Sequence, residues 1–130
     1  MLSLGIENIG EMAVIECKGR IVRSDAALKL RAAVTSQRKS RIIVLDLTEV
    51  SAVEGGGLGM LWFLQRWAID HDILLKLYGP TPAVRERLEH NNSKLRFDFA
   101  AFGELVVLMA AAENQPQVAV AEIQQQAKAA

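Results

Sequence analysis

The middle of the sequence places an apolar segment, three glycines and a second apolar segment close together. Residues 42–45 form an apolar run without polar alternation, which is typical of a strand covered on both faces. Glycines occupy positions 55–57, and the apolar residues 58–69 that follow are long enough for a helix. A buried strand followed by a connection and an apolar helix is a unit of α/β sheets with parallel strands. No other feature of the chain constrains the fold as much.

The remaining segments continue this alternation of strands and helices. We expect strands at residues 2–9, 12–19, 41–46, 73–78 and 95–99, and helices at residues 26–37, 58–69, 83–90 and 102–113. Ser24 or Asp25 is expected to cap the first helix and Thr81 the third, with Pro82 at its first position. The pattern predicts an α/β fold, with a mixed β-sheet whose parallel central strands are packed by about four helices. The predicted domain spans residues 1–113, and the Ala/Gln-rich residues 114–130 are expected to form a weakly ordered or helical tail.

Charge and composition favour an ordinary cytoplasmic protein. The 15 basic residues balance the 15 acidic ones, so no basic surface for nucleic acid is indicated. The single cysteine, Cys17, cannot form an internal disulfide, which fits a reducing compartment. The sequence shows no signal peptide and no apolar run long enough for membrane insertion. We therefore expect a cytoplasmic location.

No catalytic or metal-binding constellation emerges from the sequence. His71 and His90 are isolated from each other and from other metal-ligand types, so each is interpreted as a surface histidine. Cys17 lies in a predicted strand and is interpreted as a small buried apolar residue. Asp46 ends the central predicted strand without a nucleophile or general base beside it, which favours a role in bracing a loop. We expect no enzymatic activity, no metal and no cofactor.

The glycine-rich segment has two interpretations. Three glycines leave the start of a helix without covering side chains, and the first amides of a helix carry the positive end of its dipole. An anion or the backbone of another protein could approach such a turn closely. The simpler interpretation is a tight connection that needs small residues for packing.

The helix predicted at residues 58–69 carries more apolar residues than one buried stripe requires. Leu58, Leu61, Trp62 and Ile69 are expected to face the sheet. Met60, Phe63, Leu64 and Trp67 recur at helical spacing on the remaining circumference. Core packing explains most of this pattern, and the rest predicts an exposed apolar surface for a partner or for self-association.

Four segments together resemble the STAS domain family, the fold of the bacterial anti-sigma factor antagonists. They are the strand that ends at Gly19, the strand at residues 42–47, the loop and helix start at residues 50–61, and residues 77–79 followed by Pro82. The resemblance covers roughly residues 4 to 112. It implies that a partner anti-sigma kinase phosphorylates a serine in the glycine loop, and that the unphosphorylated form binds this kinase and frees the sigma factor.

The chain departs from the family pattern at the residues of this switch. The family has Asp-Ser-Ser-Gly-Leu-Gly or a close variant, where this chain has residues 54–59 with Gly55 at the position of the phosphorylated serine. The family also has an acidic residue at the position of Val22. A phosphate adds about two negative charges and disrupts docking, and Gly55 has no hydroxyl to receive one. Glu54 keeps a carboxylate beside the helix, where it could act as a cap.

The resemblance implies a protein-interaction module that resembles an anti-sigma factor antagonist and is fixed in one signalling state. Its partner-binding residues would be Glu54, Gly55, Gly56, Gly57, Leu58, Gly59, Met60, Phe63, Ser24 and Asp25. The expected partner is an anti-sigma factor with a serine-kinase-like fold, and a second copy of the chain is a further candidate. Two alternatives stay open: an accessory STAS subunit of a transporter that contacts an ATPase subunit, and a regulatory domain that binds a nucleotide or another anion.

Overall fold

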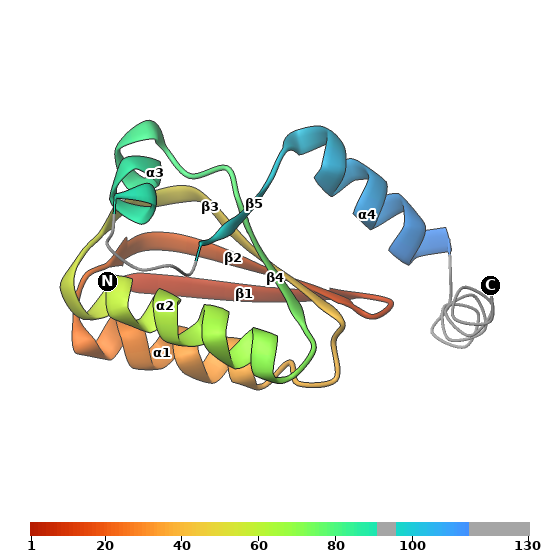
Figure 1. Cartoon of the computed structure of the whole chain (residues 1–130), viewed down its shortest axis with the longest axis horizontal. Helices are drawn as coiled ribbons and strands as arrows, with labels where there is room; N and C mark the ends of the chain where they lie inside the picture. The colour runs from red at the N-terminus through yellow and green to blue at the C-terminus, as the bar shows by residue number, and fades with distance from the viewer. Residues whose placement is uncertain (91–95, 115–130) are drawn as a thin grey trace.

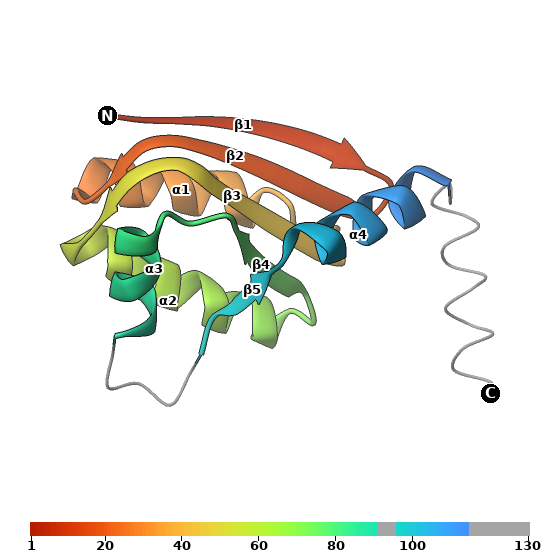
Figure 2. The ribbon, with the colours of Figure 1, turned by 90° about the horizontal axis from the view of Figure 1, so that it is seen from above.

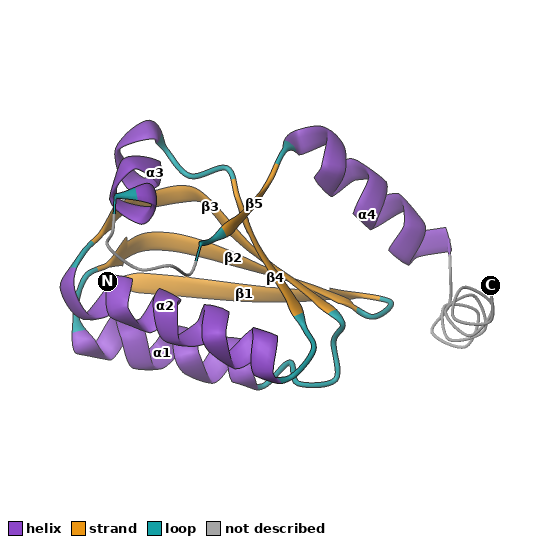
Figure 3. Cartoon of the chain, viewed as in Figure 1, coloured by secondary structure: helices purple, strands orange, loops and turns teal. Residues whose placement is uncertain are grey.

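A computed structural model describes residues 1–90 and 96–114 of the 130-residue chain. This part of the chain contains five strands and four helices in the alternating order that the sequence predicts (Figures 1 and 3). The elements are β1 (Leu2–Ile9), β2 (Met12–Ile21), α1 (Ser24–Thr35), β3 (Ile42–Val53), α2 (Gly55–Asp70), β4 (Leu74–Tyr78), α3 (Pro82–Glu89), β5 (Asp98–Ala100) and α4 (Phe102–Asn114).

The strands form one mixed sheet in the order β1-β2-β3-β4-β5. β1 and β2 are an antiparallel hairpin, while β2, β3, β4 and β5 run parallel to one another. Each parallel connection contains one helix: α1 joins β2 to β3, α2 joins β3 to β4, and α3 joins β4 to β5. The predicted α/β fold with parallel central strands and four helices is confirmed.

Helices cover both faces of the sheet (Figures 1 and 2). α1 and α2 contact each other and lie on one face, over the larger hydrophobic core. α4 crosses the opposite face, where Leu105, Leu108 and Met109 pack against a smaller cluster formed by Met12, Val14 and Val44. β3 therefore buries both of its sides, which explains why its sequence lacks polar alternation.

At the junction of β3 and α2, two boundaries differ from the predictions: strand pairing lengthens β3, and α2 begins earlier than expected. β3 continues past Asp46 to Val53, since β2 supplies a parallel partner as far as Ile21, which pairs with Val53. The helix after β3 begins at Gly55 rather than Leu58, so the three glycines are its first turn and not a loop before it. The last strand is Asp98–Ala100, and residue 95 of the predicted strand lies outside the described residues, as does the tail from residue 115 onward.

The caps are partly as predicted. Thr81 caps α3 by accepting a hydrogen bond from the Val84 amide at 3.3 Å, with Pro82 at the first helical position. The predicted capping of α1 by Ser24 or Asp25 is wrong. Arg23 occupies the N-cap position, so Ser24 and Asp25 already lie inside the helix, where their side chains make no cap hydrogen bond.

Candidate functional site

The ends of β2 and β3 bring the starts of α1 and α2 together. The Glu54 amide donates a hydrogen bond to the Ile21 carbonyl at 3.2 Å, which joins the two strand ends. Gly57 lies directly against the same carbonyl, and a Cβ atom at this position would overlap both the carbonyl and the Ile21 side chain. Gly57 is therefore needed for packing, because α2 approaches the end of β2 backbone to backbone.

The fold favours glycine at position 55 but not at positions 56 and 59. Gly55 has φ +53°, a conformation that L side chains adopt at a cost, and a Cβ atom there would lie 3.6 Å from the Val22 carbonyl oxygen. Gly56 and Gly59 are exposed, and a Cβ atom at either would meet nothing within 4 Å. Neither packing nor backbone geometry requires glycine at these two positions. Compared with alanine, each glycine costs the helix about 0.5–1 kcal/mol.

Glu54 leaves the start of α2 uncapped. It is the N-cap residue with extended backbone angles, but its side chain makes no cap hydrogen bond, so the predicted capping role is wrong. Its carboxylate instead lies 3.7 Å from the Arg87 guanidinium of α3. Both side chains are more than half exposed, so this ion pair contributes little to stability. The long glutamate side chain reaches outward to α3, and the positive end of the α2 dipole faces solvent.

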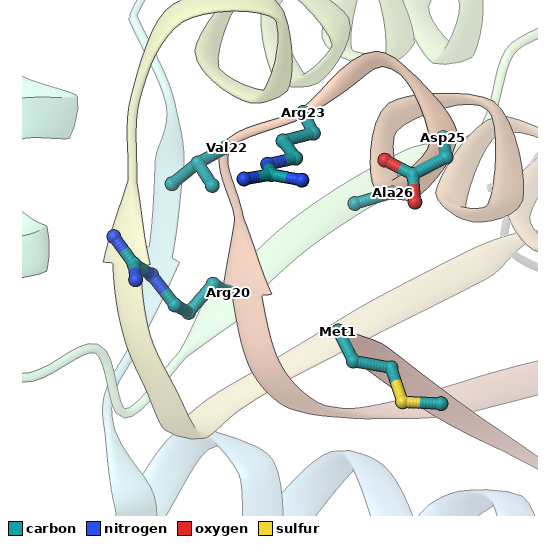
Figure 4. A pocket seen from close by; sticks show the side chains of 6 residues that line it. All are labelled: Met1, Arg20, Val22, Arg23, Asp25 and Ala26. Atoms are coloured by element: carbon teal, nitrogen blue, oxygen red, sulfur yellow. The ribbon is translucent and has the colours of Figure 1, made fainter.

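A pocket of about 390 Å³ adjoins this turn at the start of α1 (Figure 4). It is lined by Met1, Arg20, Val22, Arg23, Asp25 and Ala26. Arg20 and Arg23 are exposed, and within the described residues neither guanidinium forms an ion pair. Asp25 lies on the opposite side of the pocket from Val22 (Figure 4), and the adjacent Ser24 is exposed in the same turn of α1.

The structure gathers most of the predicted partner-binding residues but not all of them. Residues 54–59, Ser24 and Asp25 lie at the adjoining starts of α2 and α1. Leu58 and Met60 are half-buried against the main core, so they support the turn more than they extend its surface. Phe63 lies two turns further along α2, where its exposed ring sits 5.4 Å below the Arg31 guanidinium of α1.

The apolar face of α2 is partly different from the prediction. Leu61 is buried as expected, and Leu58 and Trp62 pack against the core as half-buried residues. Leu64 is also fully buried, whereas Ile69 is 47% exposed instead of facing the sheet. The helix contacts both the sheet and α1, so its buried stripe is rotated toward α1 and includes Leu64, Gln65 and Ala68.

Cys17, Asp46 and His71, which the sequence analysis considered for chemistry, are each buried or in contact with neighbouring residues. Cys17 is buried, and desolvation, with a smaller contribution from Asp46, raises the pKa of its thiol to about 12. The Asp46 carboxylate accepts hydrogen bonds from both the amide and the hydroxyl of Thr48, at 3.0 and 2.7 Å. His71 stacks on Trp67, with 4.6 Å between ring centroids. Among the described residues, no three His, Cys, Asp or Glu side chains are grouped so that they could hold a metal ion.

Sequence reasoning missed the arginines of the site. Arg20 lies in β2, Arg23 is the N-cap residue of α1, and Arg87 lies in α3, far away in the chain. Only folding brings these three residues to the glycine turn. The sequence analysis noted only Val22 in this region, a position where the resembling family has an acidic residue, and Val22 lines the same pocket as Arg20 and Arg23. None of the helices in the described part of the chain has the length and apolar character needed to cross a membrane.

Several solved structures have the same fold. An anti-sigma factor antagonist from Mycobacterium paratuberculosis superposes with a TM-score of 0.68 at 15% identity, covering 85% of this chain and 95% of its own. SpoIIAA from Bacillus, in its phosphorylated form, gives 0.63 at 17% identity, covering 82% and 98%. A Moorella thermoacetica RsbS variant gives 0.63 at 15% identity, covering 86% and 98%. No protein-family model and no curated protein sequence matches the chain. The chain therefore has the STAS-like fold of the anti-sigma factor antagonists.

Proposed function

We propose that the chain is a non-enzymatic interaction module of the partner-switching type, which docks through the first turn of α2 and the adjoining start of α1. The observation that carries this proposal is the pair of exposed glycines, Gly56 and Gly59, at positions where the fold does not require glycine. Together they cost the helix roughly 1–2 kcal/mol relative to alanine. Retaining bare backbone at this cost is explained if a partner approaches the turn closely.

The proposed partner is an anti-sigma factor with a serine-kinase-like fold. In a switch of this type, a phosphate at the position of Gly55 would add about two negative charges to the docking surface. Gly55 is exposed and carries no acceptor hydroxyl, so the kinase activity of a partner could not release the module at this position. The module would then remain in the docking-competent state whatever the activity of that kinase.

The docking turn can be tested by capture from native lysate, with matched variants of the bait. Gly56→Gln adds a side chain in open space and is expected to fold normally while covering the turn. Arg66→Gln, near the other end of α2 and also exposed, is the matched control. We expect the wild-type chain and the control to recover an anti-sigma factor with a kinase fold, identified by mass spectrometry, and Gly56→Gln to lose it. Equal recovery by all three baits would refute docking at this turn.

The lost switch can be tested by restoring the hydroxyl. Gly55→Ser has room at its Cβ atom but adopts a positive φ, which costs about 1 kcal/mol. With ATP and the captured kinase, we expect Gly55→Ser to gain one phosphate and to be released, while the wild-type chain stays unmodified and bound. A Gly55→Ser chain that folds but is never phosphorylated by the captured protein would remove the link to partner switching.

The two alternatives make different predictions in the same experiments. Recovery of transport ATPase subunits would support an accessory subunit of a transporter. The anion-binding alternative draws on Arg20 and Arg23, which line the pocket and form no ion pair with any other described residue. It predicts that ATP or inorganic phosphate raises the melting temperature of the wild-type chain, and that Arg23→Ala abolishes the shift.

A further inference from the structure

The outer edge of β1 has no neighbouring strand among the described residues. β1 is the first strand of the sheet and pairs with β2 on its inner side, and no described element continues the sheet beyond it (Figure 2). An open strand edge presents unpaired backbone amides and carbonyls to other chains, and proteins often block such an edge with proline, lysine or a bulge. Residues 3–9 contain no proline or lysine, and their register with β2 is regular.

The hairpin register determines which backbone groups of β1 face outward. The two residues that flank a two-residue hairpin turn form a hydrogen-bonded pair, and here Ile9 pairs with Met12 across such a turn. The Met1 carbonyl accepts a hydrogen bond from the Arg20 amide at 3.4 Å, which agrees with the same alternation. Odd-numbered residues therefore direct their backbone groups toward β2. The even-numbered residues direct theirs outward, and these are Leu2, Leu4, Ile6 and Asn8.

Two features limit the open part of this edge to residues 4–8. The Lys29 ammonium of α1 donates a hydrogen bond to the Leu2 carbonyl at 2.7 Å, which closes the edge where the strand begins. The hairpin turn after Ile9 closes it where the strand ends. The outward-facing residues that stay open are Leu4, Ile6 and Asn8. Ile6 is the middle one, so the open segment is symmetric about it.

A second copy of β1, running antiparallel along this edge, would satisfy every open backbone group. Leu4 of one copy pairs with Asn8 of the other, and Ile6 pairs with Ile6. Each such pair exchanges two hydrogen bonds, so about six would form across the contact. We propose that two copies of the chain pair antiparallel through β1, centred on Ile6, and join their sheets into one continuous sheet.

The side chains of β1 suit this self-pairing. Ile6 is 42% exposed, although it lies on the same face of the strand as Leu4, which packs against the main core. Antiparallel pairing brings the two Ile6 side chains together on that face and removes apolar surface from water. Glu7 is the charged residue of the strand, and it comes opposite Gly5 of the other copy. No like charges therefore face each other.

A second copy fits the edge better than an extended peptide from another protein. A peptide could form the same backbone hydrogen bonds, but it has no reason to match a segment that is closed at both ends and symmetric about Ile6. One strand on each side is a small contact, so a dissociation constant in the micromolar range is expected. Residues 4–8 line neither the pocket at the start of α1 nor the first turn of α2, so this association does not depend on the proposed function.

Analytical ultracentrifugation of the full chain over a range of concentrations tests the association. Ile6→Lys places two like charges opposite each other at the centre of the pair, whereas Glu7→Lys places its lysine opposite Gly5 and is the matched control. We expect the wild-type chain to dimerise, Ile6→Lys to weaken the dimer roughly tenfold or more, and Glu7→Lys to leave it unchanged. A wild-type chain that stays monomeric up to about 1 mM would overturn the proposal and leave the edge to a different protein. A dimer that tolerates Ile6→Lys would place the interface elsewhere and overturn it too.

Cysteine cross-linking tests the register without a charge. In a Cys17→Ala background, Ile6→Cys places a thiol opposite its own copy, with the two Cα atoms about 5.5 Å apart, a separation that a disulfide can span. Asn8→Cys lies on the same open edge, but its two copies would be about 14 Å apart along the strands. Under mild oxidation we expect disulfide-linked dimers from Ile6→Cys and much slower linkage from Asn8→Cys. Equal linkage of the two variants, or linkage of neither, would show that β1 does not pair about Ile6.

Discussion

The contact between Gly57 and the end of β2 allows a sharp test of how the site is built. A methyl group at Gly57 would overlap the Ile21 carbonyl, which also accepts the Glu54 amide hydrogen bond. The start of α2 must then move away from β2 to accommodate Gly57→Ala. The neighbouring Gly56 has open space at its Cβ position, so Gly56→Ala is a matched substitution in the same helical turn.

The expected effects of the two substitutions have opposite signs. Overpacking at Gly57 costs about 1–3 kcal/mol, and a weakened hydrogen bond to Ile21 adds about 1 kcal/mol. Alanine regains about 0.5–1 kcal/mol of helix propensity, so Gly57→Ala should destabilise the fold by about 1–3 kcal/mol in total. Gly56→Ala should stabilise it by about 0.5–1 kcal/mol, because alanine favours the helix and meets no obstacle.

Urea unfolding and thermal unfolding, both followed by tryptophan fluorescence, are suitable assays, since both tryptophans lie in α2. For a domain of this size, the melting temperature of Gly57→Ala should fall by roughly 3–10 °C, and that of Gly56→Ala should rise by about 2–3 °C. Gly57→Ala should also weaken partner capture, because it moves the docking turn. Equal stability of the two variants would refute the assignment of Gly57 to packing and of Gly56 to surface function.

Three further substitutions test the core and the α4 contact. Gln65 is buried, and within the described residues its side-chain oxygen has no hydrogen-bond partner, so Gln65→Leu should stabilise the chain by about 1 kcal/mol in urea unfolding. The raised pKa of Cys17, about 12 against 9.0, means that only the unfolded thiol ionises between these values. Stability should therefore fall as pH rises above 9, by about 2 kcal/mol at pH 10.5, and a Cys17→Ala chain with the same pH dependence would contradict this. Lys76→Met removes the ion pair of Lys76 with Glu104 of α4, so it should cost about 1 kcal/mol and speed amide exchange in α4, while Lys18→Met, which removes an exposed ion pair, should change neither.

Local patterns in the sequence determined the element order and most of the core. The apolar run at residues 42–45 indicated a strand buried on both faces, because no solvent-facing side required polar residues. Thr81 and Pro82 predicted the start of α3, because a helix cap depends on residues only three positions apart. The resemblance to anti-sigma factor antagonists correctly implied the fold, which depends on this order of elements.

Contacts between distant segments decided what the sequence alone left open or led us to predict wrongly. β3 extends to Val53 because β2 pairs with it, and the buried stripe of α2 includes Leu64 instead of Ile69 because α1 packs beside it. Likewise, Arg87 reaches Glu54 from α3. A Cβ atom at Gly57 would overlap Ile21, whereas one at Gly56 would meet nothing within 4 Å, and only the fold distinguishes these two adjacent glycines. Periodicity and capping are local properties that a short window of sequence contains. Packing distances and the surroundings of a glycine depend on residues far away in the chain, and only the folded backbone brings these together.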